Sequence, residues 1–296
     1  MKRICIPVSG GETSAYMALR LRDQLQESVE VIYPFANTGQ ENEETLKFIK
    51  LLQDKYELPV TWLESVVYKD ERKSSGHKIV DFDSACRDGS LFDDICYEYG
   101  LPNPNFFHCT RELKENPILS YCSSIGWGRP PQYLRAIGIR FDELDRVSPN
   151  YKINGLYYPL AFDWQITKPH VNRFWASQSE RLNLKGWQGN CKWCYKKDHR
   201  KHARMIIDTP DIYDVPRQLE RKYKHVKPKD GETERKMFRA KKGSTDKQGL
   251  SVDELFEYCA TLIPWSHNDA EDYSAQDDLF GGCGTDCAPF QNEGAA

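Results

Sequence analysis

The chain has 296 residues, of which 39% are hydrophobic and 29% charged, and its formal net charge is −3 at pH 7. Aromatic residues make up 12% of the sequence, which excludes disorder throughout, and no apolar run approaches the roughly 18 residues that cross a bilayer. The apolar stretch at residues 4–8 is too short for a signal peptide. We therefore expect a cytoplasmic protein without membrane contact, with one large α/β domain and an appendage or with two small domains.

The N-terminal part alternates short apolar strands with amphipathic helices. Strands are predicted at residues 3–8, 30–36 and 60–63, and a helix with an apolar face follows each of the first two. This alternation with short loops is typical of a parallel sheet with right-handed crossovers. We predict a Rossmann-like α/β fold, in which ligands bind at the carboxyl ends of the strands. Residues 9–14 and 37–41 fall at two of these ends.

The remainder of the chain has a less regular pattern. Residues 65–90 are polar and are predicted to form a flexible insertion, 113–125 a helix and 132–139 a further strand, and beyond Lys168 the chain is mostly helical. The predicted domains are a nucleotide-binding domain at 1–165, a helical region with a Cys-x-x-Cys motif at 166–221, a basic linker at 222–249 and an acidic tail at 250–296.

A glycine-rich turn follows the first predicted strand, with the sequence Ser9-Gly10-Gly11-Glu12-Thr13-Ser14. Glycines let several backbone N–H groups point inward, and the following helix adds its N-terminal donors and the positive end of its dipole. The hydroxyls of Ser9, Thr13 and Ser14 add further donors. This combination predicts a phosphate site, although a plain strand-to-helix turn also uses glycine. It is not a Walker A loop, because no Gly-Lys-Ser/Thr closes it.

With Phe35-Ala36-Asn37-Thr38-Gly39-Gln40-Glu41 after the second strand, the loop resembles one adenine-nucleotide-binding family. That family contains PP-loop ATP pyrophosphatases and phosphoadenosine phosphosulfate (PAPS) reductases. Further similar segments are Cys109-Thr110-Arg111-Glu112-Leu113-Lys114 with Pro117, Gly138-Ile139-Arg140-Phe141-Asp142-Glu143 with Arg146, Tyr158-Pro159-Leu160, and Gly189-Asn190-Cys191-Lys192-Trp193-Cys194. They follow a consistent order and are most similar to PAPS-reductase-like proteins, many of them phage-encoded.

The resemblance implies an adenine nucleotide alpha-hydrolase-like fold that binds ATP or PAPS. By resemblance, the nucleotide phosphates are held by Ser9, Gly10, Gly11, Thr13 and Ser14, and the adenosine pocket is lined by Asn37, Thr38 and Gly39. Arg140 would approach a phosphate or sulfate group, which suits a bidentate guanidinium. Asp142 and Glu143 are candidates for a Mg²⁺ ion on the nucleotide. The chain departs from many ATP pyrophosphatases at Thr13, where they carry an acid, and at Glu12, where Lys is common.

Cys191 and Cys194 form a Cys-x-x-Cys pair, and His108 and Cys109 lie far upstream. In a chain without an export signal, thiols held by a metal are the first expectation. The set resembles the 4Fe-4S site of iron–sulfur sulfonucleotide reductases, with His108 as the fourth ligand in place of a further Cys. Three thiolates would also leave one iron open, as in sulfur-inserting PP-loop enzymes. A Cys₃His zinc site and unligated thiols are the alternatives.

Two C-terminal features are also candidates. Cys283-Gly284 loosely resembles the Cys-Gly of PAPS reductases, which makes Cys283 a candidate catalytic residue, with an incidental thiol as the alternative. The stretch from Lys196 to Lys242 has sixteen Lys and Arg against eight Asp and Glu. It could follow the phosphate backbone of tRNA or DNA, or it could be a solvated charged face.

The predicted function is nucleotide-dependent sulfur chemistry. In one version an ATP-dependent sulfurtransferase adenylates a nucleic-acid acceptor, and sulfur from a cluster, supplied by a thiol or sulfide donor, then displaces AMP. The first alternative is an oxidoreductase, a PAPS or APS reductase that releases sulfite. The second is a nucleotide-binding subunit without catalytic activity.

Overall fold

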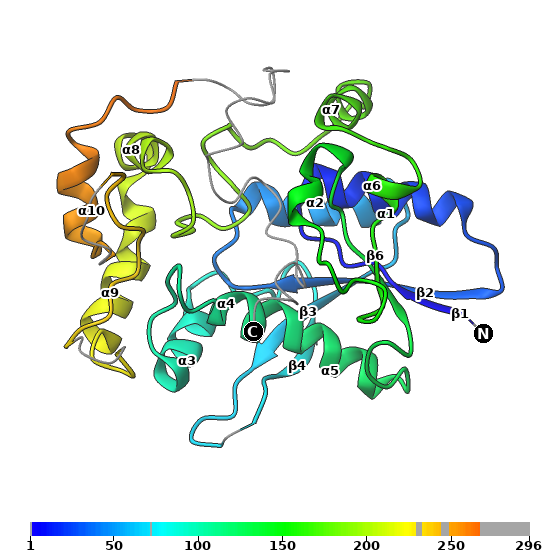
Figure 1. Ribbon diagram of the computed structural model, residues 1–296, viewed down its shortest axis with the longest axis horizontal. Helices are drawn as coiled ribbons and strands as arrows, with labels where there is room; N and C mark the ends of the chain where they lie inside the picture. The colour runs from blue at the N-terminus through cyan, green and yellow to red at the C-terminus, as the bar shows by residue number, and fades with distance from the viewer. Residues whose placement is uncertain (1, 72, 229–232, 244–248, 267–296) are drawn as a thin grey trace.

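A six-stranded sheet in the order β4-β3-β2-β1-β5-β6 forms the centre of the computed structural model (Figure 1). The structure describes residues 2–71, 73–228, 233–243 and 249–266. The strands are β1 (Lys2–Cys5), β2 (Val29–Asn37), β3 (Val60–Val66), β4 (Gly76–Val80), β5 (Leu134–Ala136) and β6 (Leu156–Tyr157). All neighbouring strands are parallel except β3 and β4. The predicted Rossmann-like α/β fold is confirmed.

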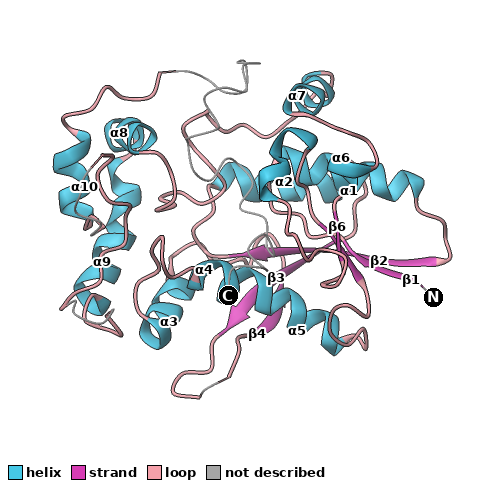
Figure 2. Ribbon diagram, viewed as in Figure 1, coloured by secondary structure: helices cyan, strands magenta, loops and turns pink. Residues whose placement is uncertain are grey.

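Helices lie on both faces of the sheet and beside one end of it (Figures 1 and 2). They are α1 (Glu12–Gln24), α2 (Glu43–Asp54), α3 (Ser90–Tyr99), α4 (His108–Thr110), α5 (Asn116–Ser124), α6 (Pro159–Phe162), α7 (Lys168–Ala176), α8 (His199–Asp208), α9 (Asp214–Tyr223) and α10 (Val252–Cys259). A π-helical turn, Arg111–Glu115, joins α4 to α5. Helices α1 and α2 cover one face and α5 the other, whereas α8, α9 and α10 form a separate group. No helix in the described part of the chain is long and apolar enough to cross a membrane.

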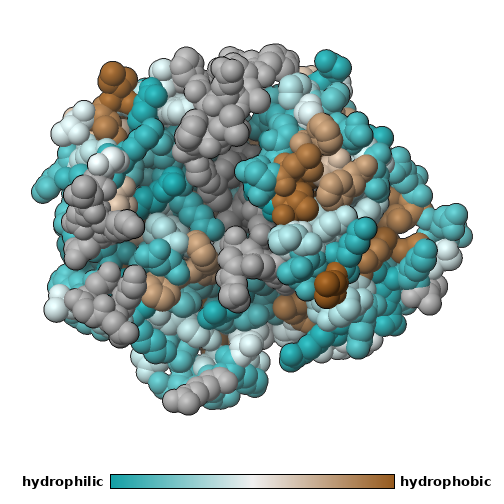
Figure 3. Space-filling model, viewed as in Figure 1, coloured by the Kyte–Doolittle hydropathy of each residue, from teal (hydrophilic) through white to brown (hydrophobic). Residues whose placement is uncertain are grey.

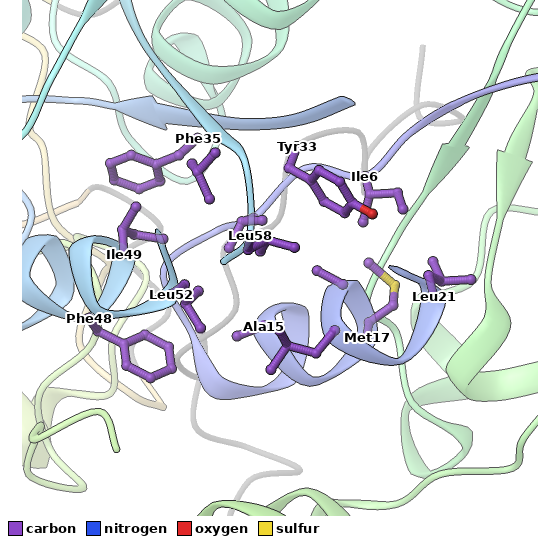
Figure 4. Close-up of a cluster of buried hydrophobic side chains, with 14 of the residues drawn as sticks. Ile6, Ala15, Met17, Leu21, Tyr33, Phe35, Phe48, Ile49, Leu52 and Leu58 are labelled. Atoms are coloured by element: carbon purple, nitrogen blue, oxygen red, sulfur yellow. The ribbon is translucent and has the colours of Figure 1, made fainter. Parts of the chain in front are cut away.

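The main hydrophobic core lies between the sheet and helices α1 and α2 (Figure 4). Met17 from α1, Ile49 from α2 and Phe35 from β2 are fully or almost fully buried there. Their apolar spacing is the helical and strand periodicity on which the sequence prediction rests. Val171 and Trp175 of α7 join the same core, so it includes residues from beyond the predicted domain boundary at 165, which stays a prediction.

Two further hydrophobic clusters complete the fold. One lies on the α5 face of the sheet and includes Cys5 and Cys122. The other joins α3 to α8, α9 and α10, with Trp193 among its buried side chains. Phe238 also belongs to this second cluster, although it falls in the predicted basic linker. Several buried side chains between residues 91 and 113 belong to the same cluster, so this part of the chain packs with the C-terminal helices.

Strand β4 lies inside the segment 65–90, for which the sequence predicts a flexible insertion. It pairs antiparallel with β3, with Leu63 opposite Ile79 and Ser65 opposite His77. Five residues give little periodicity. The free edge of β3 supplies the backbone partners that order this segment, and that edge cannot be seen locally in the sequence.

Glu220 links two helices of the C-terminal group and leads to a testable pH dependence. Its buried carboxylate accepts the N–H of Val252, at the start of α10, at 2.8 Å. Burial raises the pKa of Glu220 from 4.5 to about 7. Because the pKa of Glu220 is higher in the folded than in the unfolded chain, protonated Glu220 adds to the free energy of unfolding. This contribution is complete below the pKa of the unfolded chain and is lost as the pH rises through the pKa of the folded chain.

We therefore expect Glu220→Gln to flatten the fall in unfolding free energy between pH 4.5 and about pH 7, the unfolded and folded pKa values of Glu220. Urea denaturation across that range measures the effect. Replacing the exposed Glu257 by Gln is the matched control and should leave the profile of the unmodified protein unchanged. Identical profiles for the Glu220 variant and the unmodified protein would contradict the assignment.

Candidate nucleotide and cysteine site

The predicted phosphate loop lies where the sheet order changes direction, because β2 flanks β1 on one side and β5 flanks it on the other. Such switch points are where open α/β sheets bind ligands. Backbone pairing continues past β1 as far as Val8, whose N–H donates to the Pro34 carbonyl at 2.9 Å. Gly10 follows with a φ of +86°, and a Cβ there would lie 2.4 Å from Thr45 Cγ2. Both conformation and space require glycine at this position.

The two serines of the loop bond to each other and to the loop backbone. Their hydroxyl oxygens lie 2.9 Å apart, and Ser14 Oγ accepts the Ser9 N–H at 3.0 Å and donates to the Gly11 carbonyl at 3.0 Å. Both side chains are buried. These bonds fix the curvature of the loop. Gly11 provides no side-chain cap for the N–H groups of the first turn of α1, so these groups are the donors that the predicted phosphate site would use.

Arg140 lies beside the loop, with Nη1 3.4 Å from Thr13 Oγ1. The same guanidinium pairs with Asp142 at 3.0 Å and with Glu143 at 3.3 Å. The two acids proposed for Mg²⁺ thus balance the charge of Arg140. A phosphate at Arg140 would have to compete with these carboxylates.

The turn after β2 is held by its own side chains. Asn37 donates to Glu64 Oε1 at 2.7 Å and accepts the Gly39 N–H at 3.1 Å. Thr38 donates its N–H and its hydroxyl to the Glu41 carboxylate, each at 2.8 Å. Asn37, Thr38 and Gly39, the predicted adenosine-pocket residues, therefore form one buried and internally bonded turn.

The Cys-x-x-Cys segment pairs directly with this turn. Lys192 donates its N–H to the Gln40 carbonyl at 2.8 Å, and Asn42 donates its N–H to the Asn190 carbonyl at 2.7 Å. The Asn190 side-chain amide also donates to the Ser9 carbonyl at 2.8 Å, in a buried bond. Residues up to 181 positions apart thus place the cysteine pair at the edge of the sheet that carries the predicted phosphate loop.

Trp193, between the two cysteines, anchors the segment from the interior. Its indole N–H donates to Gln40 Oε1 at 2.6 Å, and its ring centroid lies 4.8 Å from that of Phe92. Gln40 in turn donates to the Gly39 carbonyl at 2.6 Å. Gln40, Asn190 and Trp193 stand inside conspicuous motifs, but the sequence alone assigns no role to these three side chains. Their roles appear only once the two segments are known to pair.

The environment of Cys191 opposes ionisation of its thiol. Desolvation raises the pKa of Cys191 well above its usual value, and nearby Cys194 and Glu41 raise it further. Lys197 and Lys114 act in the opposite direction. The side chain of Lys197 is almost fully buried and donates to the Cys191 carbonyl at 2.8 Å. A bound cation would reverse the balance, because metal binding deprotonates a thiol.

Of the other two predicted metal ligands, Cys109 contacts a residue adjacent to this pair. Cys109 Sγ is 3.6 Å from the hydroxyl of Tyr195, the residue after Cys194. Burial lowers the pKa of His108 to about 4, which keeps the ring neutral, and its Nε2 is buried without a hydrogen-bond partner. Across the described ranges, however, no three His, Cys, Asp or Glu side chains gather closely enough to hold a metal ion. The four residues do not fit a metal centre in this arrangement, and the site stays a prediction.

The other two candidates from the sequence are Cys283 and the basic stretch from Lys196 to Lys242. Cys283 lies outside the described residues. Within the basic stretch, Lys197 and Lys201 are buried, so only part of the positive charge can meet a nucleic acid. Lys196 is partly exposed, and its ammonium lies 4.5 Å from the centroid of the Phe107 ring.

The chain is similar to known proteins both in sequence and in structure. No family model matches the chain. It is 28% identical over 213 residues to the uncharacterized nin region protein ORF290 of Escherichia phage lambda, covering 71% of this chain and 71% of that protein. Among solved structures it is similar to the U34-tRNA thiolase NcsA from Methanococcus maripaludis with its 4Fe-4S cluster, at a TM-score of 0.38 and 15% identity, over 87% of this chain and 80% of that chain. A TM-score this low establishes no correspondence between individual residues.

The phosphate loop leads to a stability prediction. Gly10→Ala should lower the free energy of unfolding more than Gly126→Ala, because both glycines have positive φ but only the first Cβ meets a neighbour within 4 Å. We expect an extra loss of about 1–3 kcal/mol from overpacking, measured by urea denaturation. Thr45→Ser removes the obstructing Cγ2, so the double variant Gly10→Ala/Thr45→Ser should recover the free energy of unfolding that is lost to overpacking. Equal losses for the two glycine variants would disprove the steric account.

Proposed function

We propose that the chain binds ATP at residues 9–14 and uses it to transfer sulfur to a nucleic-acid acceptor. The supporting observation is the hydrogen bond from the Asn190 amide to the Ser9 carbonyl, at 2.8 Å, which holds the cysteine segment on the predicted phosphate loop. The resemblance to PP-loop ATP pyrophosphatases and PAPS-reductase-like proteins supports the same assignment. In this proposal the protein is cytoplasmic, as its sequence predicts.

The proposed reaction has two steps. An acceptor oxygen attacks the α-phosphorus of ATP, so that a P–O bond forms and pyrophosphate leaves. Sulfide, supplied by its donor, then attacks the adenylated carbon or phosphorus atom of the acceptor, so that a C–S or P–S bond forms and AMP leaves with the original oxygen. Bringing the donor and the activated acceptor together lowers the barrier, because it replaces a bimolecular encounter by an oriented contact.

The chain's own residues have distinct roles in this proposal. The N–H groups at the start of α1 hold the nucleotide phosphates, and Arg140 stabilises that side of the loop through its contact with Thr13. The buried turn from Asn37 to Gly39 borders the adenosine. Cys191 and Cys194 lie at the sulfur side, where the thiol of Cys191, whose pKa is raised by burial, becomes reactive only if a cation or a base removes its proton.

A calorimetric titration of anaerobically purified protein with ATP, and separately with PAPS, tests the nucleotide assignment. We expect binding of one ATP per chain and weaker binding of PAPS. A clear preference for PAPS would instead favour the reductase, and Cys283 would then be the residue to replace. Binding of neither nucleotide would refute the proposal. ATP binding without turnover, in the presence of sulfide and either RNA or DNA, would favour the non-catalytic subunit.

Metal analysis tests the cysteine prediction separately. If Cys109, Cys191 and Cys194 bind iron or zinc, Cys191→Ala should remove the metal and leave ATP affinity within about twofold, because its side chain lies outside the loop. Cys259→Ala is the control, since Cys259 is buried in the second cluster and bonds to the His199 carbonyl. If the unmodified protein contains neither iron nor zinc, the predicted metal centre is wrong, and the nucleotide assignment is unaffected.

A further inference from the structure

An exposed aromatic ring lies where the two cysteine-bearing segments meet at the surface. Phe107 is 39% exposed and precedes His108 and Cys109 in the chain. The ammonium of Lys196, the second residue after Cys194, lies 4.5 Å from the centroid of its ring. This contact joins the same two segments at the surface that the contact between Cys109 and Tyr195 joins in the interior.

A second cation lies one helical turn away from this ring. The backbone N–H of Arg111 donates to the Phe107 carbonyl at 3.2 Å, so the two residues lie one turn apart, and the Arg111 guanidinium lies 5.5 Å from the centroid of the Tyr99 ring. Its side chain is 52% exposed, whereas the side chain of its carboxylate partner Glu112 is 3% exposed. The solvent-facing part of this ion pair is therefore the guanidinium. Phe107, Arg111 and Lys196 are named here the Phe107 surface.

The composition of this surface selects the chemistry of its ligand. An exposed aromatic ring accepts an unpaired nucleobase by stacking, and cations beside it pair with the flanking phosphates. The bases of a duplex are stacked on one another and cannot stack on Phe107, so a duplex would contact this surface only through its phosphates, at the two cations. On the face shown in Figure 3 the protein is mainly hydrophilic, with separate hydrophobic patches. An exposed apolar side chain is thus not unusual in itself, and the adjoining cations are what distinguish Phe107.

We propose that the Phe107 surface binds a single-stranded nucleic acid, with one base stacked on Phe107 and neighbouring phosphates at Lys196 and Arg111. This assignment rests on the proposed function for its biological role, since it would bring the acceptor strand to Cys109 and Cys194. It locates the nucleic-acid contact at residues 107–111 together with Lys196, rather than along the whole basic stretch.

Phe162 offers a matched control for the ring. It is 46% exposed and lies on α6, and its ring stacks on Tyr151 with the centroids 5.4 Å apart. Phe162→Ala therefore removes an exposed phenyl group of the same size from a different element. Phe107→Trp keeps an aromatic face at the proposed site.

The test is fluorescence anisotropy of the full chain with labelled single-stranded RNA and DNA dodecamers and with a duplex of the same sequence. We expect Phe107→Ala to weaken single-strand binding by about 5- to 100-fold, as the loss of one stacked base does. Phe107→Trp should restore the affinity, and Phe162→Ala should leave it unchanged. Lys196→Ala should reduce the slope of log K against log salt by about 0.7, the value for one phosphate of a single strand.

Four results would overturn the proposal. They are an unmodified protein that does not bind single strands, one that prefers the duplex, a Phe107→Ala variant that binds like the unmodified protein, and equal losses for the Phe107 and Phe162 variants. The RNA and DNA arms show which of the two is the ligand. An ATP titration of the same samples separates this test from that of the proposed function, because ATP binding without Phe107-dependent strand binding refutes the surface alone.

Discussion

The buried hydrogen bond between the Asn190 amide and the Ser9 carbonyl connects the two chemically distinctive parts of this protein. Its energy is modest, of the order of 1 kcal/mol for a typical bond of this kind. Its geometric effect is larger, because Ser9 begins the phosphate loop and Asn190 directly precedes Cys191. The backbone bonds between Gln40 and Lys192 and between Asn42 and Asn190 hold the same register. Moving the cysteine segment would leave several buried polar groups unpaired, which is more costly than the loss of one contact.

The packing of the fold supports this arrangement from both sides. The main core holds α1 and α2 against the sheet and so fixes the loop after β1 and the turn after β2. The second cluster buries Trp193 together with Phe92 of α3 and side chains of α8, α9 and α10. The Trp193–Gln40 bond then connects that cluster to the turn after β2. The loop after β1 is flanked by Val8 and Ala15 of the main core, and the cysteine segment by Trp193 and Tyr195 of the second cluster. The two segments meet through polar contacts, which is an arrangement suited to a site between two packed units.

Local sequence patterns predict the sheet and the position of the loop, because apolar periodicity and glycine turns are properties of neighbouring residues. They do not predict β4, whose order depends on the edge of β3, or the burial of Lys197 against the Cys191 carbonyl. The hydroxyls of Ser9 and Ser14 show the same limit in another form. The sequence identifies them as donors for phosphate, but the fold directs them toward each other. Residue type indicates what a side chain can do, and long-range pairing decides which partner it finds.

Charge compensation around Arg140 supports the proposal that backbone N–H groups are the anion donors of the loop. Arg140 approaches Thr13 but is already balanced by Asp142 and Glu143, and in many PP-loop ATP pyrophosphatases an acid stands where this chain has Thr13. A carboxylate at that position would add negative charge beside the proposed phosphates. Thr13 instead accepts a hydrogen bond from Arg140 without adding charge. An anion bound here as proposed would meet fixed backbone donors, whose positions do not depend on ionising a side chain.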